Sequence, residues 1–226
     1  MPTALIIGAS RGIGREMVRQ YLADGWRVIA TARSDEQRAA LEAMGAVGLK
    51  IDVTSAESVA GLGWQLDDEK LDAAWLVAGL YGPRHDGFPT QNEFDDVMHT
   101  NVLAAMRILP LVAPLVANAG KHGGGKLAVI SSRMGSIGER ESPNGSLYRA
   151  SKAALNSVLK DVSLTFGPQG VICAAFHPGW VQTDMGGEGA ALPVNVSVAD
   201  LRKTLAALTS ADNGKFLNHD GAPIAW

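Results

Sequence analysis

The sequence contains little of what secreted, metal-binding or nucleic-acid-binding proteins depend on. Its 226 residues include one cysteine, Cys173, which cannot form an intramolecular disulfide and is typical of a small buried hydrophobic residue. The five histidines are scattered without the paired spacing of metal ligands, so we expect no metal site. The net charge of −3 argues against a nucleic-acid-binding surface and favours a small or neutral partner.

Targeting signals and long apolar runs are also missing. Residues 1–8 lead straight into a short apolar segment, without a basic region and a long hydrophobic stretch. No apolar run approaches the ~20 residues of a membrane span. We therefore expect a cytoplasmic protein with no membrane partner.

What is present fits one globular domain. With 46% hydrophobic and 19% charged residues, the chain can bury a sizeable core and shows no compositional sign of disorder. Its length suits one large α/β domain, and no repeat or linker divides it. We expect a single domain over residues 1–226.

Short apolar segments alternate with amphipathic ones along the chain. The predicted strands are 4–7, 26–32, 47–51, 71–78, 126–131, 171–176 and 215–217, and the predicted helices are 13–23, 35–44, 55–64, 91–119, 147–166 and 198–208. This alternation predicts βαβ units and a parallel sheet of about seven strands flanked by helices, the doubly wound, three-layer α/β fold of the Rossmann type. Pro110 and Pro114 are expected to kink or interrupt the helix at 91–119, with a turn at 123–125 and a long loop at 183–196.

A glycine cluster follows the first predicted strand directly. Gly8, Gly12 and Gly14 are spaced G-x-x-x-G-x-G, not as the common G-x-G-x-x-G. Gly8 would turn the chain out of the strand, and Gly12 and Gly14 would let a pyrophosphate approach the positive end of the next helix. The alternative is a tight strand-to-helix turn that binds no ligand.

The end of the second predicted strand indicates the type of dinucleotide. An acidic residue there would bind the ribose 2′-hydroxyl of NAD, but this chain has Arg33. Arg33 and Arg11 are two candidate cations for a 2′-phosphate, so we expect NADP(H) in preference to NAD(H), which stays possible; alternatively, the arginines are only solvated. Asp52, after the third strand, is a candidate acceptor for the adenine amino group, or equally a helix cap.

Tyr148 and Lys152 lie four positions apart at the start of a predicted helix, so their side chains share one face. The pKa of a phenol is near ~10 in water, and a fixed ammonium beside it favours the phenolate. Ser132, at the end of the fifth strand, is placed to hold the same substrate oxygen. The pair alone would occur by chance in roughly one of ten such sequences, so it needs support from elsewhere in the chain.

Taken in order, the motifs resemble those of the short-chain dehydrogenases/reductases over nearly the whole chain. They are similar to the family's glycine motif, adenine-contact pair, Asn-Asn-Ala-Gly motif, catalytic Asn, Ser motif, Tyr-x-x-x-Lys motif and nicotinamide-contact segment, here residues 8–14, 52–53, 78–79, 100–102, 131–135, 148–152 and 178–183. Within the family, residues 131–137, 177–180, 183–187 and 220–226 resemble the branch of C-factor and the carbonyl reductases.

The resemblance implies a catalytic set of Asn101, Ser132, Tyr148 and Lys152. Tyr148 would exchange a proton with the substrate oxygen that Ser132 holds, Lys152 would lower the tyrosine pKa and hold the nicotinamide ribose, and Asn101 would position a water. With the two arginines, the expected cofactor-binding set is Gly8, Ser10, Arg11, Gly12, Ile13, Gly14, Arg33, Asp52, Val53, Ala78, Gly79, Tyr148, Lys152, Pro178, Gly179, Val181 and Thr183.

The implied function is an NADP(H)-dependent oxidoreductase that reduces an aldehyde, ketone or quinone to an alcohol, or catalyses the reverse reaction. The alternative is an NADP(H)-binding signalling or regulatory protein of the C-factor type with little turnover. A structural protein that binds no nucleotide would require the glycine turn to be fortuitous. By analogy with the family, we expect a homodimer or homotetramer.

Two departures from the family pattern stand out. Leu76 and Val77 replace the usual pair of asparagines, which removes side-chain hydrogen bonds that brace the central strands. Sixteen positions separate Ser132 from Tyr148 instead of about thirteen, so the loop 139–145 is lengthened, which loops tolerate cheaply. We expect this loop, with residues 81–84 and 184–196, to shape the substrate pocket; Trp180 and Met185 either wall it or belong to the core.

Overall fold

The computed structural model describes residues 1–85, 87–117, 125–187 and 189–226. Its seven parallel strands form one sheet in the order β3-β2-β1-β4-β5-β6-β7. They are β1 (Thr3–Ile7), β2 (Arg27–Ala32), β3 (Val47–Lys50), β4 (Ala73–Leu76), β5 (Lys126–Ile130), β6 (Ile172–His177) and β7 (Lys215–Asn218). The predicted doubly wound parallel sheet is confirmed, and the strand order reverses between β1 and β4.

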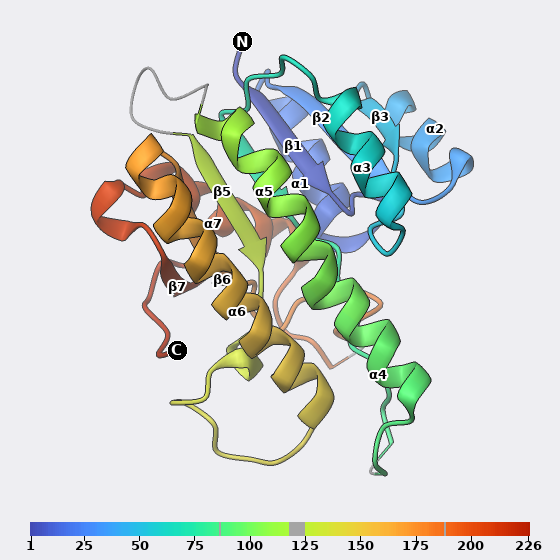
Figure 1. Cartoon of the computed structure of the whole chain (residues 1–226), viewed down its shortest axis with the longest axis vertical. Helices are drawn as coiled ribbons and strands as arrows, with labels where there is room; N and C mark the ends of the chain where they lie inside the picture. The colour runs from blue at the N-terminus through green and yellow to red at the C-terminus, as the bar shows by residue number, and fades with distance from the viewer. Residues whose placement is uncertain (86, 118–124, 188) are drawn as a thin grey trace.

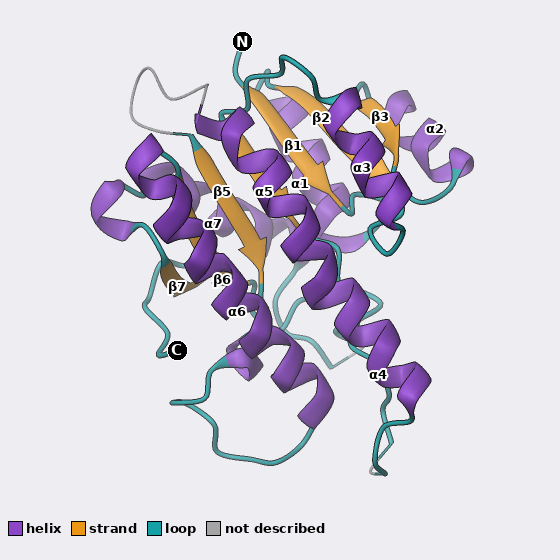
Figure 2. Ribbon diagram, in the orientation of Figure 1, coloured by secondary structure: helices purple, strands orange, loops and turns teal. Residues whose placement is uncertain are grey.

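Helices cover both faces of the sheet (Figures 1 and 2). They are α1 (Gly12–Ala23), α2 (Asp35–Ala43), α3 (Ala56–Gln65), α4 (Gln91–Met98), α5 (Ala104–Ala117), α6 (Ser146–Phe166) and α7 (Val194–Ala207). Side chains of β1 alternate between two cores: Leu5 and Ile7 pack in the core beneath α3, α5 and α6, whereas Ala4 and Ile6 pack in the core beneath α1 and α7. Because both faces are covered, central strands such as β1 are buried throughout.

Short polar residues fix where several helices begin. Ser34 caps α2 by accepting a hydrogen bond from the Gln37 amide, and Thr90 forms a capping box with Glu93 at the start of α4.

Helix α7 begins earlier than predicted. Its first residue is Val194, directly after Pro193 and four residues before the predicted start. The loop predicted at 183–196 is therefore shorter than expected.

The predicted helix 91–119 is divided, but not at its prolines. A π-helical turn, His99–Leu103, separates α4 from α5, while Pro110 and Pro114 both lie inside α5. Both prolines are on the exposed side of the helix, where the carbonyl groups that lose their amide partner can be hydrated. The predicted helix end at 118–119 and the start of the turn at 123–125 lie outside the described residues.

The stretch Gln91–Ala117 also corrects the expectation about apolar runs. Its 27 residues are long and apolar enough to cross a membrane by length and composition. Half of its most apolar window is buried within the protein, where Ile108, Leu109 and Val112 belong to the core beneath α3, α5 and α6. Within the described residues, packing in the core thus accounts for half of this window.

Candidate active site

A groove of about 230 Å³ lies at the carboxyl ends of the strands, around the point where the strand order reverses. Ligands of open parallel sheets bind at this position. The predicted residues that line the groove are Gly8, Ser10, Arg11, Gly12, Ile13, Arg33, Asp52, Val53, Ala78, Gly79, Tyr148, Lys152, Pro178 and Thr183. The predicted residues outside its lining are Gly14, Asn101, Ser132, Gly179 and Val181.

The glycine turn owes its shape to three separate constraints. Gly8 has a φ of +90°, and a Cβ there would lie 2.6 Å from the Ala78 nitrogen. Gly12 has a φ of +51° and lines the groove. A Cβ on Gly14 would lie 2.2 Å from the Gly8 carbonyl oxygen, so this glycine allows α1 to pack on the turn. Packing is thus one reason for a glycine at position 14, and its role in ligand binding stays a prediction.

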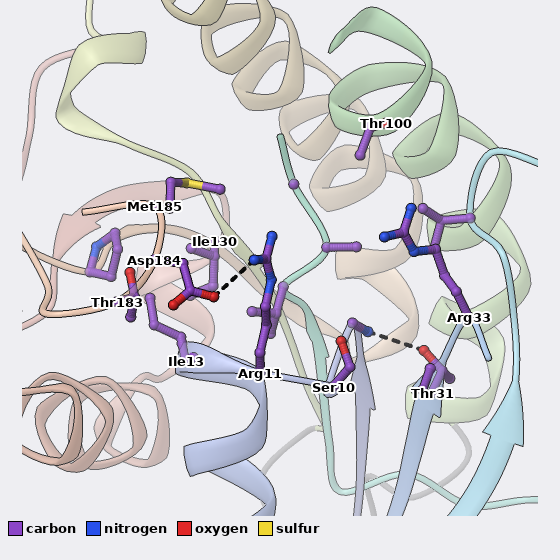
Figure 3. A pocket seen from close by; sticks show the side chains of 18 of the residues that line it. Ser10, Arg11, Ile13, Thr31, Arg33, Thr100, Ile130, Thr183, Asp184 and Met185 are labelled. Atoms are coloured by element: carbon purple, nitrogen blue, oxygen red, sulfur yellow. Dashed lines mark hydrogen bonds and ion pairs between the residues drawn. The ribbon is translucent and has the colours of Figure 1, made fainter. Parts of the chain in front are cut away.

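The positive end of α1 faces the groove without a competing anion from its own sequence. The first turn contains no acidic residue, and the N-cap residue Arg11 makes no side-chain hydrogen bond to the helix. Arg11 instead forms an ion pair with Asp184 at 2.9 Å, and both side chains are exposed. Figure 3 shows these two side chains pointing toward each other, with Arg33 on the other side of the view. The backbone amides of this turn are thus suited to a phosphate.

Asp52 is not the cap of α3, and its role as an acceptor for the adenine amino group stays a prediction. Its Oδ1 accepts hydrogen bonds from the amide and the hydroxyl of Thr54, at 2.9 and 2.7 Å, while Ser55 is the cap of α3. These bonds, and to a smaller degree the nearby Arg33, lower the pKa of Asp52. The carboxylate is therefore an anion at the rim of the groove, with Arg33 beside it.

Tyr148 and Lys152 lie side by side on α6, as predicted, and both are buried. The Lys152 ammonium donates a hydrogen bond to the Ile130 carbonyl oxygen at 2.9 Å and lies 5.6 Å from the centre of the Tyr148 ring. Burial lowers the pKa of Lys152 to about 8 and raises the pKa of Tyr148 to about 12, although the Ser132 hydroxyl opposes the rise. The expected lowering of the tyrosine pKa by Lys152 does not appear: burial dominates, and the group that opposes it is the Ser132 hydroxyl, not the ammonium.

Asn101 lies in the π-helical turn between α4 and α5, a type of turn that is frequent at functional sites. Its side chain accepts a hydrogen bond from the Leu80 amide and donates to the Leu80 carbonyl oxygen, each at 2.8 Å, and donates to the Ser151 hydroxyl at 2.9 Å. It therefore braces the segment at Leu80 that follows β4. The adjacent Thr100, which sequence reasoning missed, lines the groove instead.

A second cavity, of about 390 Å³, shares Tyr148 with the groove. Its lining comes from the segment after β4, from the lengthened loop and from the start of α6, namely Tyr81, Pro83, His85, Gly87, Pro89, Ser142, Pro143, Asn144, Gly145, Ser146, Leu147 and Tyr148. Arg149 holds the lengthened loop by donating to the carbonyl oxygen of Asn144 at 2.7 Å and to its Oδ1 at 2.9 Å.

Trp180 and Met185 do not belong to the core. Trp180 is 60% exposed and donates its indole N–H to the Gly186 carbonyl oxygen at 2.8 Å. Met185 is partly exposed and lines the groove. Other groove residues escaped sequence reasoning because they lie at or shortly after ordinary strand ends, namely Thr31, Ala32, Ile51, Thr54, Val77, Ile130 and Ser131. Their position at the ends of predicted parallel strands was the available signal. Asp184, from the segment expected to shape the substrate pocket, lines the groove.

The comparison with known proteins decides the family. The family model described as short chain dehydrogenase matches residues 2–191. The chain is a short-chain dehydrogenase. The predicted membership in this family, and with it the expectation of an enzyme, is confirmed.

Relatives of this short-chain dehydrogenase include 1-hydroxy-2-glutathionyl-2-methyl-3-butene dehydrogenase of Rhodococcus sp. (strain AD45), 34% identical over 100% of both chains. The C-signal protein of Myxococcus xanthus is 31% identical over 59% of this chain and 81% of its own. Among solved structures, the NADPH-bound carbonyl reductase from chicken fatty liver is 30% identical, with a TM-score of 0.90, over 100% of this chain and 99% of its own. The carbonyl reductase Sniffer of D. melanogaster is 32% identical, with a TM-score of 0.89, over 100% of both chains.

Proposed function

We propose that this short-chain dehydrogenase is an NADP(H)-dependent carbonyl reductase that acts on an uncharged aldehyde, ketone or quinone. The observation that carries the proposal is the position of Tyr148, which lines both the groove at the strand ends and the second cavity. A proton donor on that boundary can protonate a carbonyl group that enters from the second cavity while a hydride donor is held in the groove.

The groove fits a dinucleotide phosphate. The close approach of Gly8 to Ala78, the left-handed Gly12 and the uncapped start of α1 leave backbone amides available for a pyrophosphate. Arg33, at the end of β2, is the candidate partner of a 2′-phosphate, with Arg11 as a second cation. Solved relatives that hold NADPH or NADP, such as the chicken carbonyl reductase and a reductase from Pseudomonas aeruginosa, support this choice. The bound nicotinamide would supply the hydride.

The second cavity is suited to the carbonyl substrate. Among the described residues, no lysine, arginine, aspartate or glutamate lines it, and three prolines and the Tyr81 ring contribute apolar surface. One of its polar groups is engaged within the loop: the Ser142 hydroxyl donates to Asn144 Oδ1 at 2.9 Å. Because no permanently charged side chain lines the described part of this cavity, an uncharged carbonyl compound is favoured.

The proton chemistry favours reduction. Because the pKa of Tyr148 is about 12, the phenol keeps its proton at neutral pH and can give it to a carbonyl oxygen that gains the hydride. Ser132 would hold that oxygen, and Lys152, with a pKa of about 8, would be mainly protonated near neutrality and able to return a proton to Tyr148. Asn101 would act indirectly, by fixing the segment around Leu80. The cytoplasmic location and the homodimer or homotetramer stay predictions.

The test is a panel of aldehydes, ketones and quinones with NADPH, followed by the absorbance of the reduced cofactor. We expect wild-type turnover with at least one uncharged carbonyl compound. Tyr148→Phe should bind NADPH with an unchanged Kd and turn over at least about a hundredfold more slowly, since a positioned proton donor contributes factors of this order. A Tyr148→Phe enzyme with the parent rate would show that the proton comes from elsewhere.

The similarity to C-signal supports a second candidate function. A protein that binds NADP(H) and responds to it, with little turnover, would show tight NADPH binding and no oxidation of NADPH with any member of the panel. The complete set of Asn101, Ser132, Tyr148 and Lys152 favours the enzyme, because a protein that only binds the nucleotide has no need of a proton donor.

A further inference from the structure

Tyr81 packs directly against the catalytic tyrosine. The centres of the Tyr81 and Tyr148 rings are 4.6 Å apart and the ring planes differ by 29°, so the two rings are stacked. The guanidinium carbon of Arg84 lies 4.8 Å from the centre of the Tyr81 ring, and the Lys152 nitrogen lies 5.6 Å from the centre of the Tyr148 ring. Two stacked phenols thus lie between two cations, in the sequence Arg84, Tyr81, Tyr148, Lys152.

Arg84 also joins two walls of the site. Its Nη2 donates a hydrogen bond to the Met185 carbonyl oxygen at 2.6 Å. Met185 and the neighbouring Asp184 line the cofactor groove, and Asp184 is paired in turn with Arg11 of the glycine turn. Tyr81 lines the second cavity. The side chain of Arg84 therefore links the substrate-side segment, through Tyr81, to the loop that borders the groove.

We propose that Tyr81 and Arg84 are positioning residues. They hold the ring of Tyr148 against the carbonyl group of the substrate and link this ring to the loop at Asp184 and Met185. The inference rests on the proposed role of Tyr148 as proton donor. A buried tyrosine ring without a stacked neighbour can tilt within its pocket, and small displacements of a proton donor from the reacting atom lower the rate steeply. Tyr81 is stacked on this ring and so restricts such tilting.

Kinetics separate a positioning role from a general contribution to folding. Tyr81→Phe keeps the stacked ring and should retain kcat within about twofold, whereas Tyr81→Leu should lower kcat by about two- to tenfold, the range of an aromatic pair. The KM for NADPH should change less than kcat in Tyr81→Leu. Because removing the ring also exposes Tyr148, the basic limb of the pH profile of kcat should move to lower pH.

Arg84→Gln has a matched control elsewhere in the chain. Arg202 lies over the ring of Tyr21 at 4.2 Å, in the core beneath α1 and α7 on the opposite side of the sheet from α6. Arg84→Gln should lower kcat by about twofold or more, the effect of losing a cation–π contact at an exposed site, while Arg202→Gln should leave kcat unchanged. Equal kcat for Tyr81→Leu, Arg84→Gln and wild type, at unchanged thermal stability, would overturn the proposal.

A second measurement needs no turnover and therefore distinguishes this inference from the proposed reaction. The chain contains three tyrosines, so ring-labelled tyrosine gives three NMR signals, which Tyr148→Phe and Tyr81→Phe assign. Arg84→Gln should shift the signals of Tyr81 and Tyr148 but not that of Tyr21, and Arg202→Gln should do the reverse. If Arg84→Gln leaves the Tyr148 signal unchanged, the stack does not position this ring. If the signals shift as expected but no carbonyl compound is reduced, the proposed reaction is at fault and the stack stands.

Discussion

Replacing Lys152 by methionine should stabilise the protein near neutral pH while removing its activity. Lys152 is fully buried and has one hydrogen-bond partner, the Ile130 carbonyl oxygen, within the described residues. Its pKa is about 8 in the folded protein, against the ordinary 10.5. Folding at neutral pH therefore forces a charge into an environment that disfavours it, whereas a methionine fills similar space without a charge.

The size of the effect follows from the gap between the two pKa values. At ~1.4 kcal/mol per pH unit, this gap corresponds to roughly 3 kcal/mol of lost stability below pH 8. Leaving the Ile130 carbonyl oxygen without its donor costs about 1 kcal/mol in the variant. We therefore expect Lys152→Met to raise the free energy of unfolding at pH 7 by about 2 kcal/mol.

The pH dependence has a definite sign. Between pH 8 and 10.5 the unfolded chain keeps the lysine proton and the folded protein has released it, so the free energy of unfolding of the wild type rises with pH. Lys152→Met lacks this rise, so the amount by which its free energy of unfolding exceeds that of the wild type should shrink and vanish as the pH approaches 10. Above pH 10 the raised pKa of Tyr148 acts in the opposite direction, because only the unfolded chain loses that proton.

Urea unfolding of wild type, Lys152→Met and Lys203→Met at pH 7, 8.5 and 10 measures the effect, with a buffer of constant ionic strength. Lys203 is an exposed lysine on α7, so its replacement should follow the wild type at every pH. The reasoning is refuted if Lys152→Met is less stable than wild type at pH 7, or if the difference between the two is the same at all three pH values.

Three further replacements probe the turn, the core and the cofactor site. Gly8→Ala places a methyl group 2.6 Å from the Ala78 nitrogen at a φ of +90°, and should cost about 1–3 kcal/mol, measured as a lower Tm, and weaken NADPH binding. Tyr21→Phe removes the acceptor of the buried Trp75 indole N–H, now at 2.9 Å, and should cost about 1–3 kcal/mol in urea unfolding. Arg33→Gln should raise the Kd of NADPH about tenfold or more and leave that of NADH nearly unchanged, as calorimetry would show.

The sequence predicted the fold well because the fold rests on local patterns. Buried strands are short apolar runs, and glycine or proline marks most of their ends, so all seven strands were expected near their true positions. The division of the long helix at His99–Leu103 was missed because a π-helical turn has no composition of its own. The prolines led to a wrong prediction for a different reason. The free-energy cost of a proline inside a helix is reduced at Pro110 and Pro114, because the helix surface is exposed there.

The site was predictable where one segment carries the chemistry, and not where distant segments meet. The Tyr148 and Lys152 pair lies on one helix face, so the spacing predicts that the two side chains lie together, although it needs the other motifs to indicate a function. The contacts of Tyr81 with Tyr148 and of Arg84 with Met185 join segments far apart in the chain, and nothing in the local sequence indicates them. The raised pKa of Tyr148 was also missed, because burial of a helix face depends on everything packed against it.

The most direct test of the central claim is the rate of NADPH oxidation by wild type and Tyr148→Phe with the same uncharged carbonyl compound, alongside the NADPH Kd of each. The account predicts turnover by the wild type, a loss of at least about a hundredfold in the variant, and equal Kd values. Equal rates in the two proteins would contradict it, and so would tight NADPH binding by a wild type that reduces no carbonyl compound.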